Sequence, residues 1–124
     1  GKLCVEVGKG YADVIEGEGR GSIRFSGFDD VHLPDTSQEE VFNTTVRPLV
    51  ADVIKGFNCT VLAHGQTGSG KTYTMEGGPG SKRGTIPRAA ELLFQSMNDQ
   101  QQAWLQVSLI EIYLEKIRDL LNPK

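Results

Sequence analysis

The sequence has few of the features that would place it in a membrane, outside the cell or on a nucleic acid. Its only two cysteines, Cys4 and Cys59, are too few for a framework of disulfide bonds. It has no recognisable signal peptide and no apolar run of the roughly 20 residues that a membrane-spanning helix needs. Its 13 basic and 16 acidic residues give a net charge of −3, so no overall positive field attracts polyanions. We therefore expect a reducing, cytoplasmic setting, no nucleic-acid partner and no membrane partner.

The length of 124 residues suits one domain, and the sequence contains no internal repeat. The chain begins with Gly1 rather than Met and ends at Pro123-Lys124, directly after an apolar segment that we predict to be helical. We interpret residues 1–124 as a single but incomplete domain of a longer protein. An incomplete sheet leaves strand edges unpaired, so we expect such a segment to aggregate or to associate through those edges.

The first half of the chain predicts a small antiparallel meander followed by a helix. Short, partly alternating apolar segments at Leu3–Val7, Ala12–Ile15 and Ser22–Phe28 are separated by glycine-rich turns, which is typical of strands. Thr36 and Glu39 then form a T-x-x-E capping box, and apolar residues follow at helical spacing as far as Gly56. Pro48 lies inside this helix and predicts a bend near Thr44–Arg47, because proline donates no backbone hydrogen bond.

The second half alternates predicted strands and helices, which indicates an α/β fold. The continuous apolar run Cys59–Ala63 favours a strand buried on both faces of a mixed or parallel sheet. A brief helix, a flexible surface loop at Gly77–Gly84 and a helix from Thr85 to about Met97 should follow. Trp104–Tyr113 predicts a long strand, and the apolar spacing in Leu114–Leu121 predicts a short terminal helix.

The stretch from Gly65 to Thr72 matches G-x-x-x-x-G-K-[ST], the phosphate-binding P-loop, in the required order of strand, loop and helix. Glycines allow the main-chain N–H groups from about Gly68 to Tyr73 to curl around a β-phosphate at the start of the helix. Lys71 should bridge the β- and γ-phosphates of ATP, and the Thr72 hydroxyl should bind Mg²⁺. The alternative, a flexible glycine and serine turn with an incidental lysine, does not explain the strand before it. The predicted nucleotide-binding residues are His64, Gly65, Gln66, Thr67, Gly68, Ser69, Gly70, Lys71, Thr72 and Tyr73.

Three other polar positions invite a functional interpretation. Asp29 and Asp30 are adjacent on an extended segment, so their carboxylates point to opposite faces, and we expect them to cap or face solvent. His32 has no metal-ligand neighbours at useful spacing, and we expect it at the surface. His64 directly precedes the P-loop: its ring could stack on the adenine, or it could be a packed or hydrogen-bonded histidine at a strand end.

Several segments in collinear order resemble the kinesin motor domain. They are Phe28-Asp29-Asp30-Val31, Thr36-Ser37-Gln38-Glu39-Glu40-Val41-Phe42, Gly56-Phe57-Asn58-Cys59-Thr60, Ala63 through Gly77, Ile86-Pro87-Arg88-Ala89, Glu111-Ile112-Tyr113 and Ile117-Arg118-Asp119-Leu120-Leu121. The resemblance covers the chain from Ser22 onward and corresponds to about the first third of a family motor head. It implies a partial P-loop NTPase head with a mixed central sheet flanked by helices.

The resemblance also implies a function. It makes the chain the ATP-binding part of a microtubule motor of the cytoplasm and cytoskeleton, with Lys71 and Thr72 as catalytic residues and ATP, ADP, Mg²⁺ and tubulin as ligands and partners. His64 then stands where kinesins usually have a tyrosine beside the adenine. Gly77–Gly84 matches a variable loop of regulatory and inhibitor contact in the family, although a mobile linker is an equal alternative. We expect any dimerisation to involve regions outside these residues.

Some family features are absent from the sequence. Kinesins carry an Arg-x-Arg-Pro near the start, a serine-rich first switch and a DxxG second switch, and none of them occurs here. We therefore expect the 124 residues alone to bind nucleotide weakly or not at all, with activity belonging to the longer protein. Two alternatives remain: a kinesin-like module that binds nucleotide or tubulin without hydrolysis, and an unrelated P-loop NTPase.

Overall fold

The computed structural model describes residues 5–15, 21–98 and 104–122. These residues fall into two compact units, Gly1–Phe94 and Gln95–Lys124, which are described separately. Cys4 and the beginning of the predicted strand Leu3–Val7 lie outside the described residues. Within the described part of the chain, no helix is long and apolar enough to cross a membrane.

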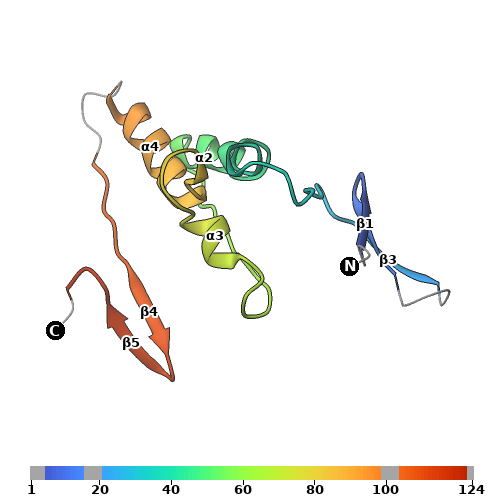
Figure 1. The fold of residues 1–124 in the computed structure, drawn as a ribbon. Coiled ribbons are helices and arrows are strands. Elements are labelled where there is room, and N and C mark those ends of the chain that lie inside the picture. The colour runs from blue at the N-terminus through green and yellow to red at the C-terminus, as the bar shows by residue number, and fades with distance from the viewer. Residues whose placement is uncertain (1–4, 16–20, 99–103, 123–124) are drawn as a thin grey trace. The chain divides into compact units, whose positions relative to one another are not determined.

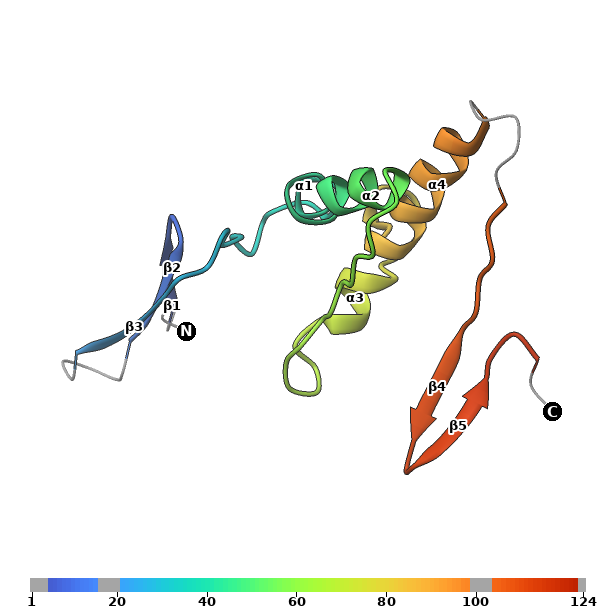
Figure 2. The same ribbon diagram turned by 180° about the vertical axis from the view of Figure 1, so that it is seen from behind.

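The first unit begins with a three-stranded antiparallel sheet, which confirms the predicted meander (Figure 2). Its strands are β1 (Val5–Gly8), β2 (Tyr11–Ile15) and β3 (Ser22–Ser26). Asp13 and Arg24 stand directly opposite each other on β2 and β3. The Arg24 guanidinium donates to both carboxylate oxygens of Asp13, at 2.8 and 2.7 Å, and lies 4.0 Å from the centre of the Tyr11 ring. This bidentate ion pair fixes the pairing of the two strands.

A continuous helical segment follows from Gln38 to Ile54. It consists of α1 (Gln38–Val41), the π-helical η1 (Phe42–Val46) and α2 (Arg47–Ile54). The residue that caps its start is Ser37, whose hydroxyl accepts a hydrogen bond of 3.1 Å from the Glu40 N–H. The predicted cap at Thr36 and Glu39 was therefore wrong by one residue, because S-x-x-E overlaps T-x-x-E in this sequence and the two patterns compete.

The π-helical segment occupies the position where Pro48 predicted a bend. Proline cannot donate to the carbonyl four residues earlier, and its ring crowds that carbonyl. The chain accommodates this by widening the turn, so that the N–H of Arg47 donates to the carbonyl of Phe42, five residues earlier. The predicted disturbance of the helix is confirmed, and it takes the form of a π turn.

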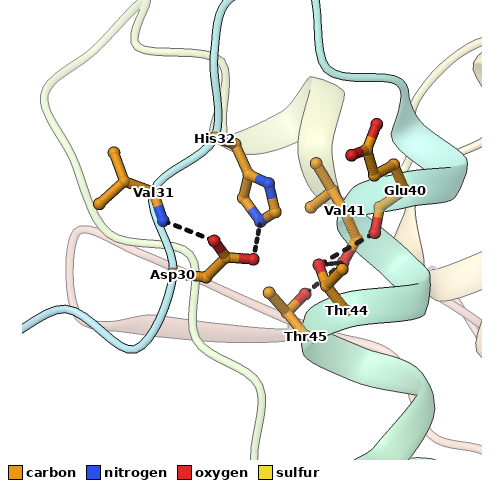
Figure 3. Close-up of polar contacts among 7 residues, drawn as sticks. All are labelled: Asp30, Val31, His32, Glu40, Val41, Thr44 and Thr45. Carbon is orange, nitrogen blue, oxygen red and sulfur yellow. Dashed lines mark hydrogen bonds and ion pairs between the residues drawn. The ribbon is translucent and has the colours of Figure 1, made fainter. Parts of the chain in front are cut away.

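Two threonine hydroxyls of this segment donate to main-chain carbonyls one turn earlier (Figure 3). The Thr44 hydroxyl donates to the carbonyl of Glu40 at 3.0 Å, and the Thr45 hydroxyl donates to the carbonyl of Val41 at 2.5 Å. Both are bonds to the residue four positions earlier, a pattern that accompanies bent helices.

The core of the first unit lies between this helical segment and α4 (Thr85–Asn98), whose position confirms the prediction (Figure 1). Phe42, Val46 and Val50 are each 6% exposed and recur every four residues, so they form one stripe along the helix. The stripe packs against partly buried apolar residues of α4, namely Ala89, Leu92 and Leu93.

The segment Cys59–Ala63 does not form the predicted buried strand. It has no regular secondary structure, no described strand pairs with it, and Val61 and Leu62 are 39% and 83% exposed. An apolar run shows that a segment tends to be buried, whereas a strand exists only when a neighbouring strand supplies its hydrogen bonds. The described residues supply no such neighbour.

The second unit contains a hairpin of β4 (Ile110–Tyr113) and β5 (Lys116–Asp119), drawn in red in Figure 2. The predicted strand over Trp104–Tyr113 is therefore regular only in its last four residues. The predicted helix over Leu114–Leu121 was wrong: Leu114 and Glu115 form the tight turn of the hairpin, with φ values of 47° and 60°. Helical spacing of leucines does not exclude a strand when the segment is this short.

Candidate nucleotide-binding site

The glycine-rich loop leads from the Cys59–Ala63 segment into α3 (Lys71–Met75). Two of its glycines need the left-handed backbone region: Gly68 has φ 81°, and Gly70, which caps α3, has φ 93°. A Cβ added at either position would meet nothing within 4 Å. Backbone conformation, rather than crowding, is therefore the reason for glycine at these positions, and both main-chain groups remain open to a ligand.

Lys71 directs its ammonium group back into the loop. The Lys71 Nζ donates to the carbonyls of Gly65 at 2.8 Å and Gln66 at 2.6 Å, and the side chain is half-buried. The first hydrogen bond of α3 runs from the Thr74 N–H to the Gly70 carbonyl at 2.9 Å. The N–H groups that precede it at the start of α3 are not used by the helix and are available to an anion beside the ammonium.

The remaining predicted site residues are all exposed. Thr72 is exposed, and none of the described residues hydrogen-bonds its hydroxyl. His64 is also exposed and lies immediately before the loop. It is therefore not packed against the end of a strand, which was one of the alternatives for this residue. Within the loop, the Ser69 N–H donates to the Gln66 carbonyl at 3.2 Å and so closes a turn. The other predicted residues of the loop, Gly65, Thr67, Gly68, Gly70 and Tyr73, are exposed as well.

A residue that the motif did not predict contacts the far end of α3. The side-chain amide of Gln38, in α1, donates to the main-chain carbonyl of Tyr73. Gln38 is only 7% exposed. A signal for it was present in the sequence, because Gln38 precedes Val41 and Phe42 by three and four residues and so lies on the apolar face of its helix. A polar residue on such a face needs a buried partner.

The loop Gly77–Gly84 has a closed, hydrogen-bonded structure rather than that of a linker. Gly77 and Arg83 form an antiparallel bridge around the 3₁₀ turn η2 (Gly80–Lys82). Arg88 of α4 donates to the carbonyls of Arg83 at 3.0 Å and Ser81 at 2.9 Å. The sequence prediction of a flexible loop missed these contacts, because composition does not show which backbone groups pair within the loop or that Arg88 of the following helix binds its carbonyls.

The acidic pair before the first helix has no catalytic arrangement. Asp29 and Asp30 are exposed, and the Asp30 carboxylate accepts a hydrogen bond of 2.9 Å from the Val31 N–H, as predicted for capping residues (Figure 3). His32 differs from its prediction as a surface residue. It is half-buried, and its buried Nε2 lies 3.7 Å from the Asp30 carboxylate without forming a hydrogen bond within the described residues.

Comparison with known proteins identifies the family. The family model described as the kinesin motor domain matches residues 12–124. Chromosome-associated kinesin KIF4A from Homo sapiens is 43% identical over 130 residues, covering 98% of this chain and 10% of the relative. Kinesin heavy chain isoform 5C from Rattus norvegicus is 44% identical over 119 residues, covering 92% of this chain and 12% of the relative.

A solved structure gives the same result for the fold. The structure of a fast kinesin is 40% identical to this chain and superposes with a TM-score of 0.84, covering 99% of this chain and 36% of the solved one. The chain thus spans about a tenth of the length of the relatives named above, and its fold is that of part of an α/β motor head. Through its P-loop, its flanking segments and these similarities, the chain belongs to the kinesin motor domain family.

Proposed function

We propose that this chain is the nucleotide-binding part of a microtubule motor that couples ATP hydrolysis to movement along microtubules in the cytoplasm. The observation that carries the proposal is the position of Lys71 inside a P-loop with left-handed glycines, in a chain of the kinesin motor domain family. The chain spans 36% of the fast-kinesin structure, so the proposed activity is that of the longer protein.

The loop residues have distinct roles in this proposal. The main-chain N–H groups from Gly68 to Tyr73 bind the β-phosphate of ATP or ADP. The Lys71 ammonium exchanges its two carbonyl partners for oxygens of the β- and γ-phosphates, an exchange that favours binding because a charged acceptor makes the stronger hydrogen bond. The exposed ring of His64 provides a surface on which the adenine can stack.

Thr72 is the residue of the loop that suits Mg²⁺. Its exposed hydroxyl offers the hard oxygen ligand that this ion prefers, and it follows Lys71 directly in the chain. When bound with the nucleotide, the ion neutralises phosphate charge. The chain contributes the threonine oxygen and the lysine ammonium on neighbouring positions of one rigid helix start.

We further propose that the two compact units belong to one motor domain, of which residues 1–124 form a part. Hydrolysis needs a group that positions the attacking water and a group that senses the γ-phosphate, and the P-loop supplies neither. The 124 residues alone should therefore show no microtubule-stimulated ATPase activity. ATP turnover by this segment in isolation would contradict the proposal that hydrolysis needs groups from the rest of the motor domain.

The test is a comparison of Lys71→Ala with Lys55→Ala in the full-length gene product. Lys71→Ala should weaken the binding of magnesium nucleotide by about 10- to 100-fold, as expected for a hydrogen bond to a charged group, and abolish ATP turnover. Lys55 is exposed at the end of α2 and, among the residues that the structure describes, forms an ion pair with Asp52 alone, at 3.0 Å. Lys55→Ala should therefore change neither nucleotide binding nor turnover. Calorimetry measures binding, and phosphate release with microtubules measures turnover. Undiminished turnover by Lys71→Ala would refute the assignment, and binding without turnover in the unchanged protein would favour a non-hydrolysing module.

A further inference from the structure

The short helix α3 has an unpaired carbonyl at its C-terminal end. The last carbonyls of any helix lack partners within the helix. In α3, the N–H groups of Glu76 and Gly77 both donate to the Thr72 carbonyl, at 2.8 and 3.2 Å. In a regular α-helix the N–H of Gly77 would donate to the carbonyl of Tyr73. Because both N–H groups donate to the Thr72 carbonyl, the Tyr73 carbonyl has no hydrogen-bond partner within the helix.

Gln38 supplies the missing donor from another helix. Its side-chain amide nitrogen donates to the Tyr73 carbonyl across 35 residues of sequence. The side chain is 7% exposed, so it is one of the few buried polar groups of the described residues. The hydrogen bond is partly buried, so losing the amide would leave the Tyr73 carbonyl without a protein donor at a site of restricted water access.

The position of Gln38 is itself fixed from two sides. It is the first residue of α1, and Ser37 caps that helix at the preceding position. Phe42, one turn later, belongs to the core shared with α4. A continuous set of contacts therefore runs from the core through α1 to the carbonyl of Tyr73, which lies two residues after Lys71 in α3.

We propose that Gln38 is a positioning residue for the phosphate-binding loop. By holding the C-terminal end of α3, it fixes where the N-terminal end of that helix presents the Lys71 ammonium and the Thr72 hydroxyl. This inference rests on the proposed function, because it assigns Gln38 a role in nucleotide binding. Gln38 hydrogen-bonds only the carbonyl of Tyr73 among the predicted site residues, so it acts on Lys71 and Thr72 through the helix.

Two substitutions at position 38 separate hydrogen bonding from packing. Gln38→Met keeps the length of the side chain and removes the donor at every pH. Gln38→Glu keeps the shape and can donate to the carbonyl only when its carboxyl group is protonated. Glu39→Gln is the matched control, since Glu39 is an exposed neighbour on α1. All are made in the full-length gene product, and the dissociation constant of magnesium ADP is measured by calorimetry.

Gln38→Met should weaken ADP binding by about tenfold, the size expected when one partly buried hydrogen bond is lost and the helix end shifts. Gln38→Glu should bind ADP better than Gln38→Met, and its affinity relative to the unchanged protein should rise as the pH is lowered from about 8 to about 6. Burial and the neighbouring carbonyl raise the pKa of a carboxyl group placed at position 38, which brings its protonation toward this range. Glu39→Gln should bind as the unchanged protein does.

Other titratable groups lie on the elements around position 38. The unchanged protein, measured at each pH, serves as the reference for their effect on binding. They are Glu39 and Glu40 on α1, Lys71, Tyr73 and Glu76 on or next to α3, and Lys82 on η2, which packs against α1. Their contribution is common to the unchanged protein and the two variants at position 38, so the ratio of their affinities at each pH isolates position 38. A thermal melt without nucleotide verifies that each variant is folded.

The outcomes distinguish this inference from the proposed function. If Gln38→Met binds ADP as tightly as the unchanged protein, or if Gln38→Glu is as impaired as Gln38→Met at every pH, Gln38 has no positioning role through its hydrogen bond. If the unchanged protein itself binds no magnesium nucleotide, the proposed function fails instead. Should Gln38→Met not fold, the comparison of Gln38→Glu with the unchanged protein across the pH range decides alone: recovery at low pH supports the role, and constant impairment overturns it.

Discussion

The turn of the β4–β5 hairpin carries an unfavourable pair of residues, and replacing them should stabilise it. Leu114 and Glu115 both have positive φ, at 47° and 60°, which is the backbone of a type I′ turn. Asparagine and glycine adopt this conformation readily, whereas leucine and glutamate do so at a cost. The perturbation is the double variant Leu114→Asn with Glu115→Gly.

The size of the effect follows from the backbone and from exposure. Left-handed geometry costs an ordinary residue about 1–2 kcal/mol, so relieving two positions recovers about 2–4 kcal/mol. The flexibility of glycine in the unfolded chain takes back about 0.5–1 kcal/mol. Leu114 is 76% exposed, so its replacement removes little burial. The hairpin should therefore become more stable by about 1–3 kcal/mol, the remainder after these opposing terms.

Hydrogen exchange of the backbone amides in β4 and β5 measures this change directly. Protection of the Ile110–Asp119 amides should rise by about five- to thirtyfold for each 1–2 kcal/mol gained. The control is Leu121→Asn, which makes the same side-chain change at an exposed residue without positive φ. It should leave protection unchanged. Equal protection in the double variant and the unchanged chain would show that the turn is not strained in solution and would refute the reasoning.

Two further predictions concern the first unit. Gly84→Ala should destabilise it by about 1–3 kcal/mol, because the new Cβ would lie 2.5 Å from the Met75 carbonyl oxygen. Gly78→Ala should be tolerated, because its Cβ would meet nothing nearer than 3.5 Å. Thermal unfolding of the two variants measures the difference in stability, and equal midpoints would contradict the prediction. The hydrogen bond from Arg24 lowers the pKa of Asp13 below its ordinary value of 3.8. Burial of the Asp13 carboxylate opposes this shift, and the positive charge of Arg24 adds to it. Because the lowered pKa belongs to the folded state, the ion pair stabilises the sheet above pH 3.8 and loses this effect as the pH falls through the folded-state pKa. The stability advantage of the unchanged protein over Asp13→Asn in urea should therefore shrink as the pH falls from about 5 to about 2, and a constant advantage would argue against the pair.

Local patterns were sufficient to predict features whose physical causes are also local. The glycines, lysine and threonine of the P-loop must lie at fixed spacing to surround a phosphate, so Gly65–Thr72 alone leads to the proposed site. The meander and α4 followed from alternation and helical spacing, and Pro48 predicted the disturbance of its helix because a missing N–H acts within one turn.

Contacts between distant segments decided the rest. The leucines after Tyr113 fitted a helix by spacing, but pairing with β4 made Lys116–Asp119 a strand, because backbone hydrogen bonds to a neighbour outweigh a weak local preference. Cys59–Ala63 has the composition of a buried strand, yet the described residues offer it no partner. The role of Gln38 could not be derived from its own neighbourhood, since its partner is a carbonyl 35 residues away that is left open only by how α3 ends. The sequence by itself predicted the residues proposed to bind phosphate, because their spacing is a local property, and only the tertiary structure showed that Gln38 contacts the helix that carries Lys71 and Thr72.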